Sequence, residues 1–222
     1  MTTDSHLSPL PSLISPDVNL SLLAGKPPLK LGILASGSGS NFEVIAQAIA
    51  ARELNAQIQV LIYNNPTAGV IARAERWGVK SVLINHRQFA NREDCDRQIV
   101  ATLKEYDAEL IVMAGWMRVV TQVFIDAFPH RMINIHPSLL PSFRGVKAVE
   151  QALAAKVKIS GCTVHLLSVE VDAGPILIQA AVPILENDTA ETLHARIQVQ
   201  EHLILPQAIA LVGQDLRRAS MI

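Results

Sequence analysis

The feature that most constrains the fold is a repeated alternation between short apolar segments and segments with helical periodicity. Leu29–Ala35 is an apolar segment of strand length, and a helical pattern covers residues 42–51 after a short loop. A second strand is expected at residues 57–63, a helix at 69–77 and a third strand at 81–84. Strands joined through helices lie parallel, with right-handed crossovers. The pattern therefore predicts an α/β fold built on a parallel sheet.

The second half of the chain continues this pattern and then departs from it. A fully buried strand is expected at residues 110–114, and a further strand at Met132–His136. Residues 160–167 and Ile176–Pro183 are both β-rich, and only the turn 168–175 separates them. Two strands joined by so short a turn pair antiparallel, which predicts a hairpin at the sheet edge.

A long helix is expected to close the chain. Residues 188–191 (DTAE) resemble a capping box, and Pro206 is expected to interrupt or kink the helix. Together the elements predict one three-layer, doubly wound domain with a mostly parallel sheet and an antiparallel C-terminal hairpin. Residues 29–222 are expected to form this domain, while residues 1–28 lack periodicity and are expected to be a flexible N-terminal extension.

Composition excludes several classes of function. The formal net charge is −1, with no dense Lys/Arg cluster, which argues against nucleic acid as a partner. Cys95 and Cys162 lie far apart without metal-ligand spacing, which favours a reducing compartment and no metal site. No apolar run is long enough to span a bilayer, and no signal peptide is recognised at the start, so a cytoplasmic protein without membrane partners is expected.

A glycine-rich loop at residues 36–41 (SGSGSN) follows the first strand and opens a helix. Backbone amides at a helix N-terminus carry partial positive charge, so a phosphate is the natural ligand. The dinucleotide fingerprint would need a third glycine where Phe42 stands and an acid where residues 64–66 (NNP) stand, which disfavours NAD. The loop is suited to a phosphomonoester, and the alternative is a tight turn without a ligand.

Asn134 and His136 lie two residues apart near the end of the Met132–His136 strand. This spacing places both side chains on one face, at the edge where open α/β sheets bind ligands. An amide donor beside an imidazole is suited to acyl transfer, because one group polarises a carbonyl and the other moves a proton. The alternative is a structural histidine at a strand end.

Three further features have both a structural and a functional interpretation. Residues 115–120 (GWMRVV) follow a buried strand and are placed to line a hydrophobic slot, although core packing also explains Trp116 and Met117. Asp172 stands in a glycine-containing turn, where it either faces a cleft or forms an Asx turn. Arg92 is either a surface charge or a ligand contact.

Four blocks in order make the sequence recognisable: SGSGSN at 36–41, AGWMRVV at 114–120, NIHPSLLP at 134–141 and VDAGPI at 171–176. They resemble the glycinamide ribonucleotide formyltransferases, folate-dependent enzymes of purine synthesis, and the resemblance extends from about Leu29 to Val212. It implies the formyltransferase fold with its Rossmann-like N-terminal half. It also implies transfer of a formyl group from 10-formyltetrahydrofolate to the amine of 5'-phosphoribosylglycinamide, without a metal.

The resemblance also implies roles for particular residues. The catalytic trio would be Asn134, His136 and Asp172. The folate contacts would be Arg92, Met117, Arg118, Val119, Val120, Asn134, Ser168, Val169, Glu170, Val171 and Asp172. The substrate contacts would be Gly39, Ser40 and Asn41 around the phosphate, with Gln198, Val199, Gln200 and Glu201 on the glycinamide side.

The loop after Pro141 departs from the family pattern. Many relatives carry Pro-Gly and histidines there, whereas residues 143–147 read FRGVK, and Arg144-Gly145 resembles the methionyl-tRNA formyltransferases. Those enzymes have an additional C-terminal domain, and the related deformylases carry an N-terminal regulatory domain, so neither is expected here. The remaining alternative is a module that binds a phosphorylated metabolite without turnover, and a homodimer stays open.

Overall fold

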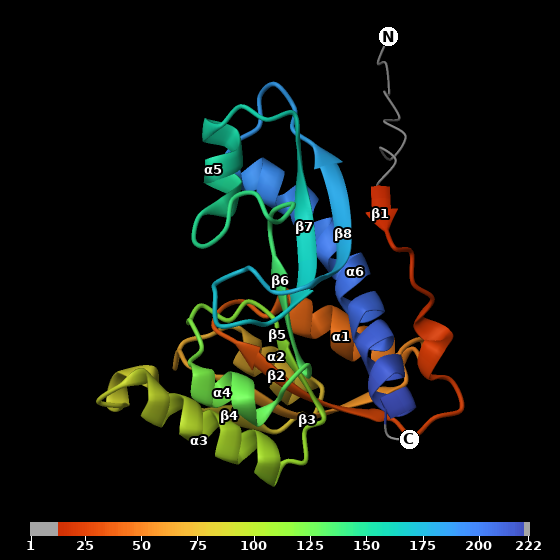
Figure 1. The fold of residues 1–222 in the computed structure, drawn as a ribbon, viewed down its shortest axis with the longest axis vertical. Coiled ribbons are helices and arrows are strands. Elements are labelled where there is room, and N and C mark those ends of the chain that lie inside the picture. The colour runs from red at the N-terminus through yellow and green to blue at the C-terminus, as the bar shows by residue number, and fades with distance from the viewer. Residues whose placement is uncertain (1–12, 220–222) are drawn as a thin grey trace.

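The structure is a computed structural model, which describes residues 13–219. Its centre is a sheet of eight strands in the order β1-β8-β7-β6-β5-β2-β3-β4. Helices lie on both sides of the sheet, and the longest, α6, crosses the whole length of the molecule (Figure 1). The predicted doubly wound, mostly parallel sheet with an antiparallel hairpin is confirmed.

Five parallel strands form the first half of the sheet. They are β2 (Leu29–Ala35), β3 (Ala56–Tyr63), β4 (Ser81–Leu83), β5 (Leu110–Met113) and β6 (Met132–His136). The connecting helices are α1 (Ser40–Ala50), α2 (Val70–Arg76), α3 (Arg92–Glu105) and α4 (Gln122–Ala127), with a short 3-10 turn η2 (His86–Gln88). Asn91 caps α3 through its side chain, which accepts from the amide of Asp94, as its position before two acids predicts.

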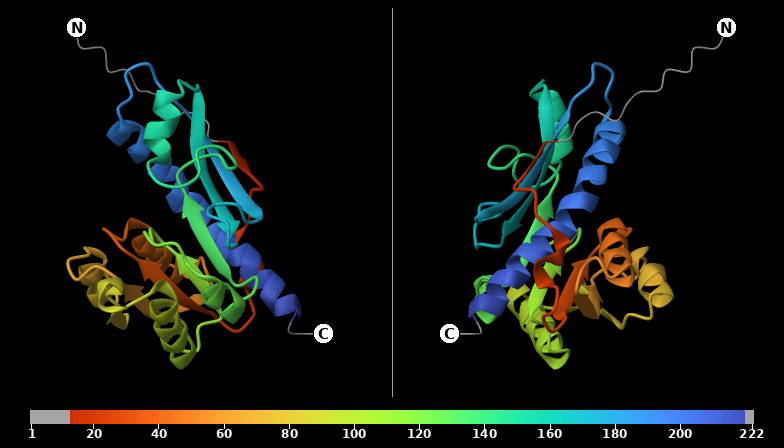
Figure 2. Two further views of the ribbon diagram at one scale, coloured as in Figure 1. Left: turned by 60° about the vertical axis from the view of Figure 1, so that its left-hand side comes forward. Right: turned by 90° about the vertical axis from the view of Figure 1, so that its right-hand side faces the viewer.

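Antiparallel strands form the other half of the sheet. They are β7 (Ile159–Leu166), β8 (Ile176–Pro183) and β1 (Leu13–Ser15), and the helices α5 (Ala148–Ala154) and α6 (Ala190–Ala219) accompany them. The side views show α6 along one face of these strands (Figure 2). This half holds β6 against β7, so two strands of opposite direction meet beside the catalytic candidates.

The prediction of a flexible extension over residues 1–28 is wrong for the part that the structure describes. Leu13–Ser15 pairs antiparallel with β8, and the 3-10 turn η1 (Leu20–Leu23) packs against α6. Leu23 is fully buried and Val18 is 8% exposed. Burial of these apolar side chains and pairing with β8 favour docking of the segment, although the run is too short to show a period. Residues 1–12 lie outside the described residues.

Helix α6 continues through Pro206, so the proline does not interrupt it. A proline inside a helix costs roughly 3 kcal/mol, because it lacks the amide hydrogen and crowds the preceding turn. Burial offsets this cost, since Pro206 and its neighbours Leu205 and Ala208 are all buried. Packing of the helix against the sheet thus outweighs the local preference of the residue.

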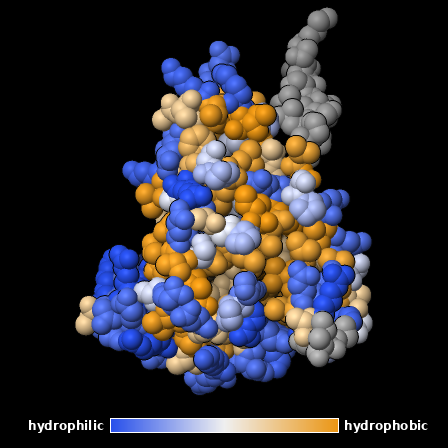
Figure 3. Space-filling model, viewed as in Figure 1, coloured by the Kyte–Doolittle hydropathy of each residue, from blue (hydrophilic) through white to orange (hydrophobic). Residues whose placement is uncertain are grey.

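Two hydrophobic clusters fill the two sides of the sheet. One contains the inner faces of α1 and α6, and the other contains those of α3 and α4. In the view of Figure 1, hydrophobic residues gather along the middle of the molecule, whereas hydrophilic residues dominate the region of α3 (Figure 3). Among the helices within residues 13–219, none combines the length and apolarity that crossing a membrane requires.

Candidate active site

A cavity of about 800 Å³ opens where the two halves of the sheet meet. Its walls come from the loops after β2 and β5, the end of β6, the turn before β8 and one face of α6. This is the edge at which the parallel strands β2, β5 and β6 all end, as open α/β sheets place their ligand sites. A cavity therefore lies at the edge of the sheet where the sequence predicts the site.

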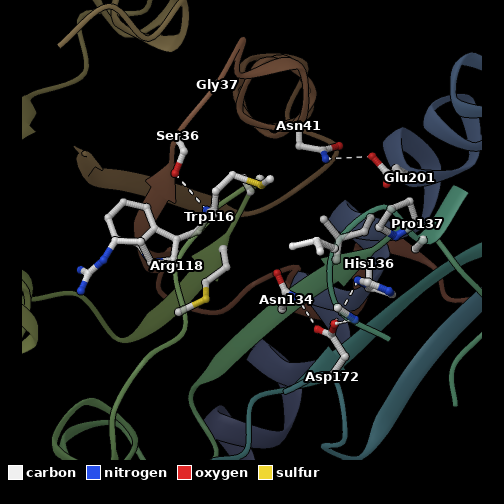
Figure 4. Close-up of a pocket in the computed structure, with 18 of the residues that line it drawn as sticks. Ser36, Gly37, Asn41, Trp116, Arg118, Asn134, His136, Pro137, Asp172 and Glu201 are labelled. Atoms are coloured by element: carbon white, nitrogen blue, oxygen red, sulfur yellow. Dashed lines mark hydrogen bonds and ion pairs between the residues drawn. The ribbon is translucent and has the colours of Figure 1, made fainter. Parts of the chain in front are cut away.

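Three side chains meet on the floor of this cavity. Asn134 and His136 project from the same face of β6, and Asp172 reaches them from the turn between β7 and β8 (Figure 4). The Nδ1 atom of His136 lies 3.3 Å from one carboxylate oxygen of Asp172. The other oxygen accepts a hydrogen bond of 3.4 Å from the Asn134 amide. Residues far apart in sequence thus form one connected polar group.

The loop after β6 also contacts this group. The Nε2 atom of His136 lies 2.9 Å from the backbone carbonyl of Phe143, and the amide of Gly145 donates to Asp172 at 2.9 Å. Both ring nitrogens of His136 therefore face oxygen acceptors.

Asp172 is held as a carboxylate by its surroundings. Burial alone would raise the pKa of its carboxyl, but the contact with His165, the Gly145 amide and the charge of His136 lower that pKa below its ordinary value. The residue has φ +50°, a left-handed conformation that aspartate tolerates better than most residues. The turn therefore presents a negative charge directly to the imidazole.

A second histidine, His165, completes the group and was not predicted from the sequence. It lies opposite Asn134 in the β6–β7 pairing and is 2% exposed. Its Nε2 atom is 3.3 Å from the Asn134 amide nitrogen and 3.6 Å from Asp172, while Nδ1 lies 2.9 Å from the carbonyl of Leu166. A histidine between Val164 and Leu166 in a strand with a continuous run of buried residues is the signal that could have found it.

The glycine loop leads into α1 with Gly39 at the N-cap position and φ +78°. A Cβ atom at this position would lie only 2.5 Å from the Val70 side chain and 2.9 Å from its Cα. Glycine is thus required both by the backbone conformation and by contact with α2. The first-turn amides of α1 have no intrahelical partners, and Gly39, Ser40 and Asn41 line the cavity.

Side chains of α6 meet the start of α1 across the cavity. The Gln198 amide donates to the Ser40 hydroxyl at 3.0 Å, and the Asn41 amide donates to Glu201 at 3.1 Å. Burial raises the pKa of the Glu201 carboxyl. The N-terminal end of α1 and a buried carboxyl therefore lie side by side.

Comparison with known proteins identifies the family. A profile described as formyl transferase matches residues 29–209. The chain belongs to the formyl transferase family. It is 39% identical to phosphoribosylglycinamide formyltransferase of Bacillus subtilis, over 85% of this chain and 97% of that relative. It is 40% identical to the human trifunctional purine biosynthetic protein adenosine-3, over 83% of this chain.

The two relatives differ in length, so the match with this formyl transferase chain covers different shares of them. The match spans about a fifth of the trifunctional protein, 18% of its length, but nearly all of the Bacillus protein. Among solved structures, glycinamide ribonucleotide transformylase 1 from Symbiobacterium toebii superimposes with a TM-score of 0.83 at 40% identity, over 85% of this chain and 89% of that one. Phosphoribosylglycinamide formyltransferase from Bacillus halodurans gives 0.80 at 38%, over 82% and 94%.

Most residues that the resemblance assigns to ligands line the cavity. They are Gly39, Ser40, Asn41, Met117, Arg118, Val119, Val120, Asn134, His136, Ser168, Val169, Val171, Asp172, Gln198 and Glu201. Four others do not line it: Arg92, Glu170, Val199 and Gln200. Arg92 is the exposed first residue of α3, and Glu170 pairs instead with Arg144 at 2.7 Å. Val199 points to the surface at 57% exposure.

Some cavity residues of this formyl transferase were not predicted. They include Glu150, Glu191 and His194. The spacing of His194, Gln198 and Glu201 is i, i+4, i+7, which places all three on one face of a helix and could have identified the first of them. Within residues 13–219, no group of three or more His, Cys, Asp or Glu side chains is arranged to hold a metal ion.

Proposed function

We propose that this chain is a phosphoribosylglycinamide formyltransferase, which transfers a formyl group from 10-formyltetrahydrofolate to the amine of 5'-phosphoribosylglycinamide in de novo purine biosynthesis. The observation that carries the proposal is the contact of Asn134, His136 and Asp172, at distances of 3.3 and 3.4 Å, on the floor of a cavity with two different walls. Relatives that carry this name and share 39% and 32% of aligned residues support it.

One wall of the cavity is suited to the phosphorylated amine. The N-terminus of α1 at Gly39, Ser40 and Asn41 offers free backbone donors and the positive end of the helix dipole to a phosphate. Glu201 lies beside this end, and its carboxyl can hold the amine of the glycinamide near the floor. The substrate would then lie along the face of α6, from its phosphate to its amine.

The other wall is suited to a flat heterocycle. Trp116, Met117, Val119 and Val120 give it an apolar surface, and the turn at residues 168–172 closes it with backbone groups. A pterin ring has hydrogen-bonding edges and two apolar faces, which such a slot accommodates. The formyl nitrogen of the co-substrate would then lie over β6, next to Asn134.

The chemistry follows from the three polar side chains. The amine attacks the formyl carbon, and a new C–N bond forms as the carbonyl oxygen gains negative charge. The Asn134 amide donates to that oxygen and stabilises it. His136 takes the proton from the attacking nitrogen and delivers one to the folate nitrogen, whose bond to the carbon breaks.

Asp172 supports His136 in this sequence. Its carboxylate fixes the orientation of the ring through Nδ1, which leaves Nε2 for proton transfer. Nε2 faces the carbonyl of Phe143, so a substrate atom must replace that carbonyl as its partner. The negative charge of Asp172 stabilises the imidazolium that forms in the middle of the reaction.

The test is a turnover assay with purified full-length chain, 10-formyltetrahydrofolate and phosphoribosylglycinamide. We expect loss of formylfolate to depend on the glycinamide, with formylated glycinamide as the product. Omission of the amine is the control for hydrolysis. Release of free formate without acceptor, or formyl transfer only to an aminoacyl-tRNA, would contradict the proposed substrate.

A further inference from the structure

The loop that joins β5 to α4, residues 114–121, forms one wall of the cavity without regular secondary structure. Trp116 and Val120 are buried, whereas Met117 and Val119 are exposed to the cavity side. A loop that presents apolar side chains to a ligand needs fixed attachments, because it has no helix or strand hydrogen bonds of its own. Two attachments hold this loop, one at each end.

The inner end is attached to the start of the glycine loop. The amide of Ser36 donates to the carbonyl of Gly115, and the Ser36 hydroxyl accepts from the amide of Met117, both at 3.0 Å. The figure shows this contact between Ser36 and the neighbourhood of Trp116 (Figure 4). Ser36 therefore joins the glycine loop and the 114–121 loop, which lie on the two walls of the cavity.

The outer end is attached to α3 by Asp96. One carboxylate oxygen accepts from the Thr121 amide at 2.7 Å, and the other lies 3.7 Å from the Arg118 guanidinium. The same guanidinium nitrogen donates to the Cys95 sulfur at 2.9 Å. The side chains of Asp96 and Arg118 are only 1% and 12% exposed. The charge of Arg118 is therefore directed to α3, away from the catalytic trio (Figure 4).

A carboxylate this deeply buried is stable only when charge and hydrogen bonds compensate it. Asp96 finds both in the 114–121 loop, at Arg118 and at Thr121, so it fixes the distance of that loop from α3. Asp96 does not itself line the cavity. Any effect of Asp96 on a ligand must therefore pass through the loop.

We infer that Asp96 is a positioning residue for the folate co-substrate, and that Arg118 serves the same attachment instead of pairing with an anionic tail of that co-substrate. The inference rests on the proposed function, because it takes the 114–121 loop to be the wall on which the co-substrate packs. Asp96 holds that wall from outside the cavity, while the catalytic trio acts on the opposite side.

The first test is Asp96→Asn. The amide oxygen can still accept from Thr121, but the charge facing Arg118 is lost. We expect the KM for 10-formyltetrahydrofolate to rise about tenfold or more, while kcat and the KM for the glycinamide stay within about twofold. Partial unfolding alone would lower the apparent kcat and leave both KM values unchanged, so the split between the two KM values identifies positioning.

The matched control is Asp94→Asn on the same helix, whose exposed carboxylate pairs with Arg97. This surface pair is expected to leave both KM values unchanged. Equal changes in the two KM values of Asp96→Asn, or none, would overturn the inference.

The second test separates positioning from direct binding. Calorimetry measures folic acid and pteroic acid, which lacks the glutamate tail, with the wild type, Asp96→Asn and Arg118→Met. We expect each variant to weaken both compounds by the same factor, and the double variant to be no weaker than the worse single one. Weakening of folic acid alone by Arg118→Met would show a direct tail contact and contradict the inference. A wild-type chain that binds neither compound would contradict the proposed function itself.

Discussion

The ends of β2 and β5 meet the cavity mainly with backbone groups and apolar side chains, whereas β6, β7 and the turn before β8 meet it with titratable side chains. In the parallel half, the glycine loop and the 114–121 loop are shaped by Gly39, Ser36 and Asp96. In the antiparallel half and in β6, the parallel strand that borders it, His136 and Asp172 are placed by strand pairing and a left-handed turn.

The difference teaches how binding and chemistry are divided in one cavity. Parallel strands all end at the same edge, so their loops form a continuous surface that holds ligands. The antiparallel strand β7 runs back along β6, so that Leu166 lies opposite Ile133, and the turn that follows brings Asp172 against His136 from the side. Substitutions in the loops after β2 and β5 should therefore change KM, and those in β6 and the antiparallel half should change kcat.

The largest effect is expected for His136→Ala. Loss of a general acid and base should lower kcat about 10²–10⁴-fold, while the affinity for folic acid stays within a few-fold. Steady-state kinetics and calorimetry measure the two quantities on the same preparation. Near wild-type turnover at saturating substrates would remove the assignment of chemistry to β6 and the antiparallel half.

Removal of residues 2–28 tests whether the antiparallel half needs its N-terminal strand. Deleting Leu23 and Val18 from the core should lower the free energy of unfolding by about 3–6 kcal/mol, at roughly 1.5–3 kcal/mol for each buried side chain. Denaturant titration measures the loss. Removal of residues 2–12 alone, which retains β1 and η1, is the control, and equal stability of both truncated chains would contradict the expectation.

Asp172→Asn should lower kcat by about 10²-fold, because the amide cannot stabilise an imidazolium at His136. The pH dependence has a defined sign. Because the pKa of Asp172 is lowered from 3.8, its contribution is complete above that value and is lost as the pH falls below it. A wild-type rate profile should therefore show no loss assignable to Asp172 above about pH 4. If Asp172→Asn changed only the acidic limb of the pH–rate profile, and that change lay above about pH 4, the proposed role of Asp172 would be contradicted.

The smallest effect is expected for Ser36→Ala, which belongs to the parallel half. Loss of the acceptor for Met117 should cost about 1 kcal/mol, which is roughly a fivefold rise in KM for both substrates with kcat nearly unchanged. Ser81→Ala on the exposed edge strand is the control. A fall in kcat with constant KM would break the division between the two halves.

Local patterns made much of the fold predictable. Leu29–Ala35, Met132–His136 and Ile176–Pro183 begin and end where the sequence predicts, because each is an apolar run bounded by turn residues. The polar pair Asn134 and His136 was found for the same reason, since its spacing is read within one strand.

Contacts between distant segments account for what was missed. Asp96 and His165 gain their importance from partners on other elements, and no local pattern reports such partners. Gly39 was expected as a place for an anion to approach, but the neighbouring Val70 also requires it. A Gly39→Val variant would therefore disturb the α1–α2 contact and cannot test phosphate binding alone.

The pairing of β1 with β8 joins two segments that lie far apart in the sequence, since Leu13 lies opposite Ala181. During synthesis, β1 leaves the ribosome long before its partner exists, so it cannot dock until nearly the whole chain has emerged. A contact of such long range forms late in folding. The three-residue strand also shields the backbone of β8 from other chains, because a bare strand edge is a template for intermolecular pairing. The nascent chain therefore exposes the edge of β8 until β1 pairs with it.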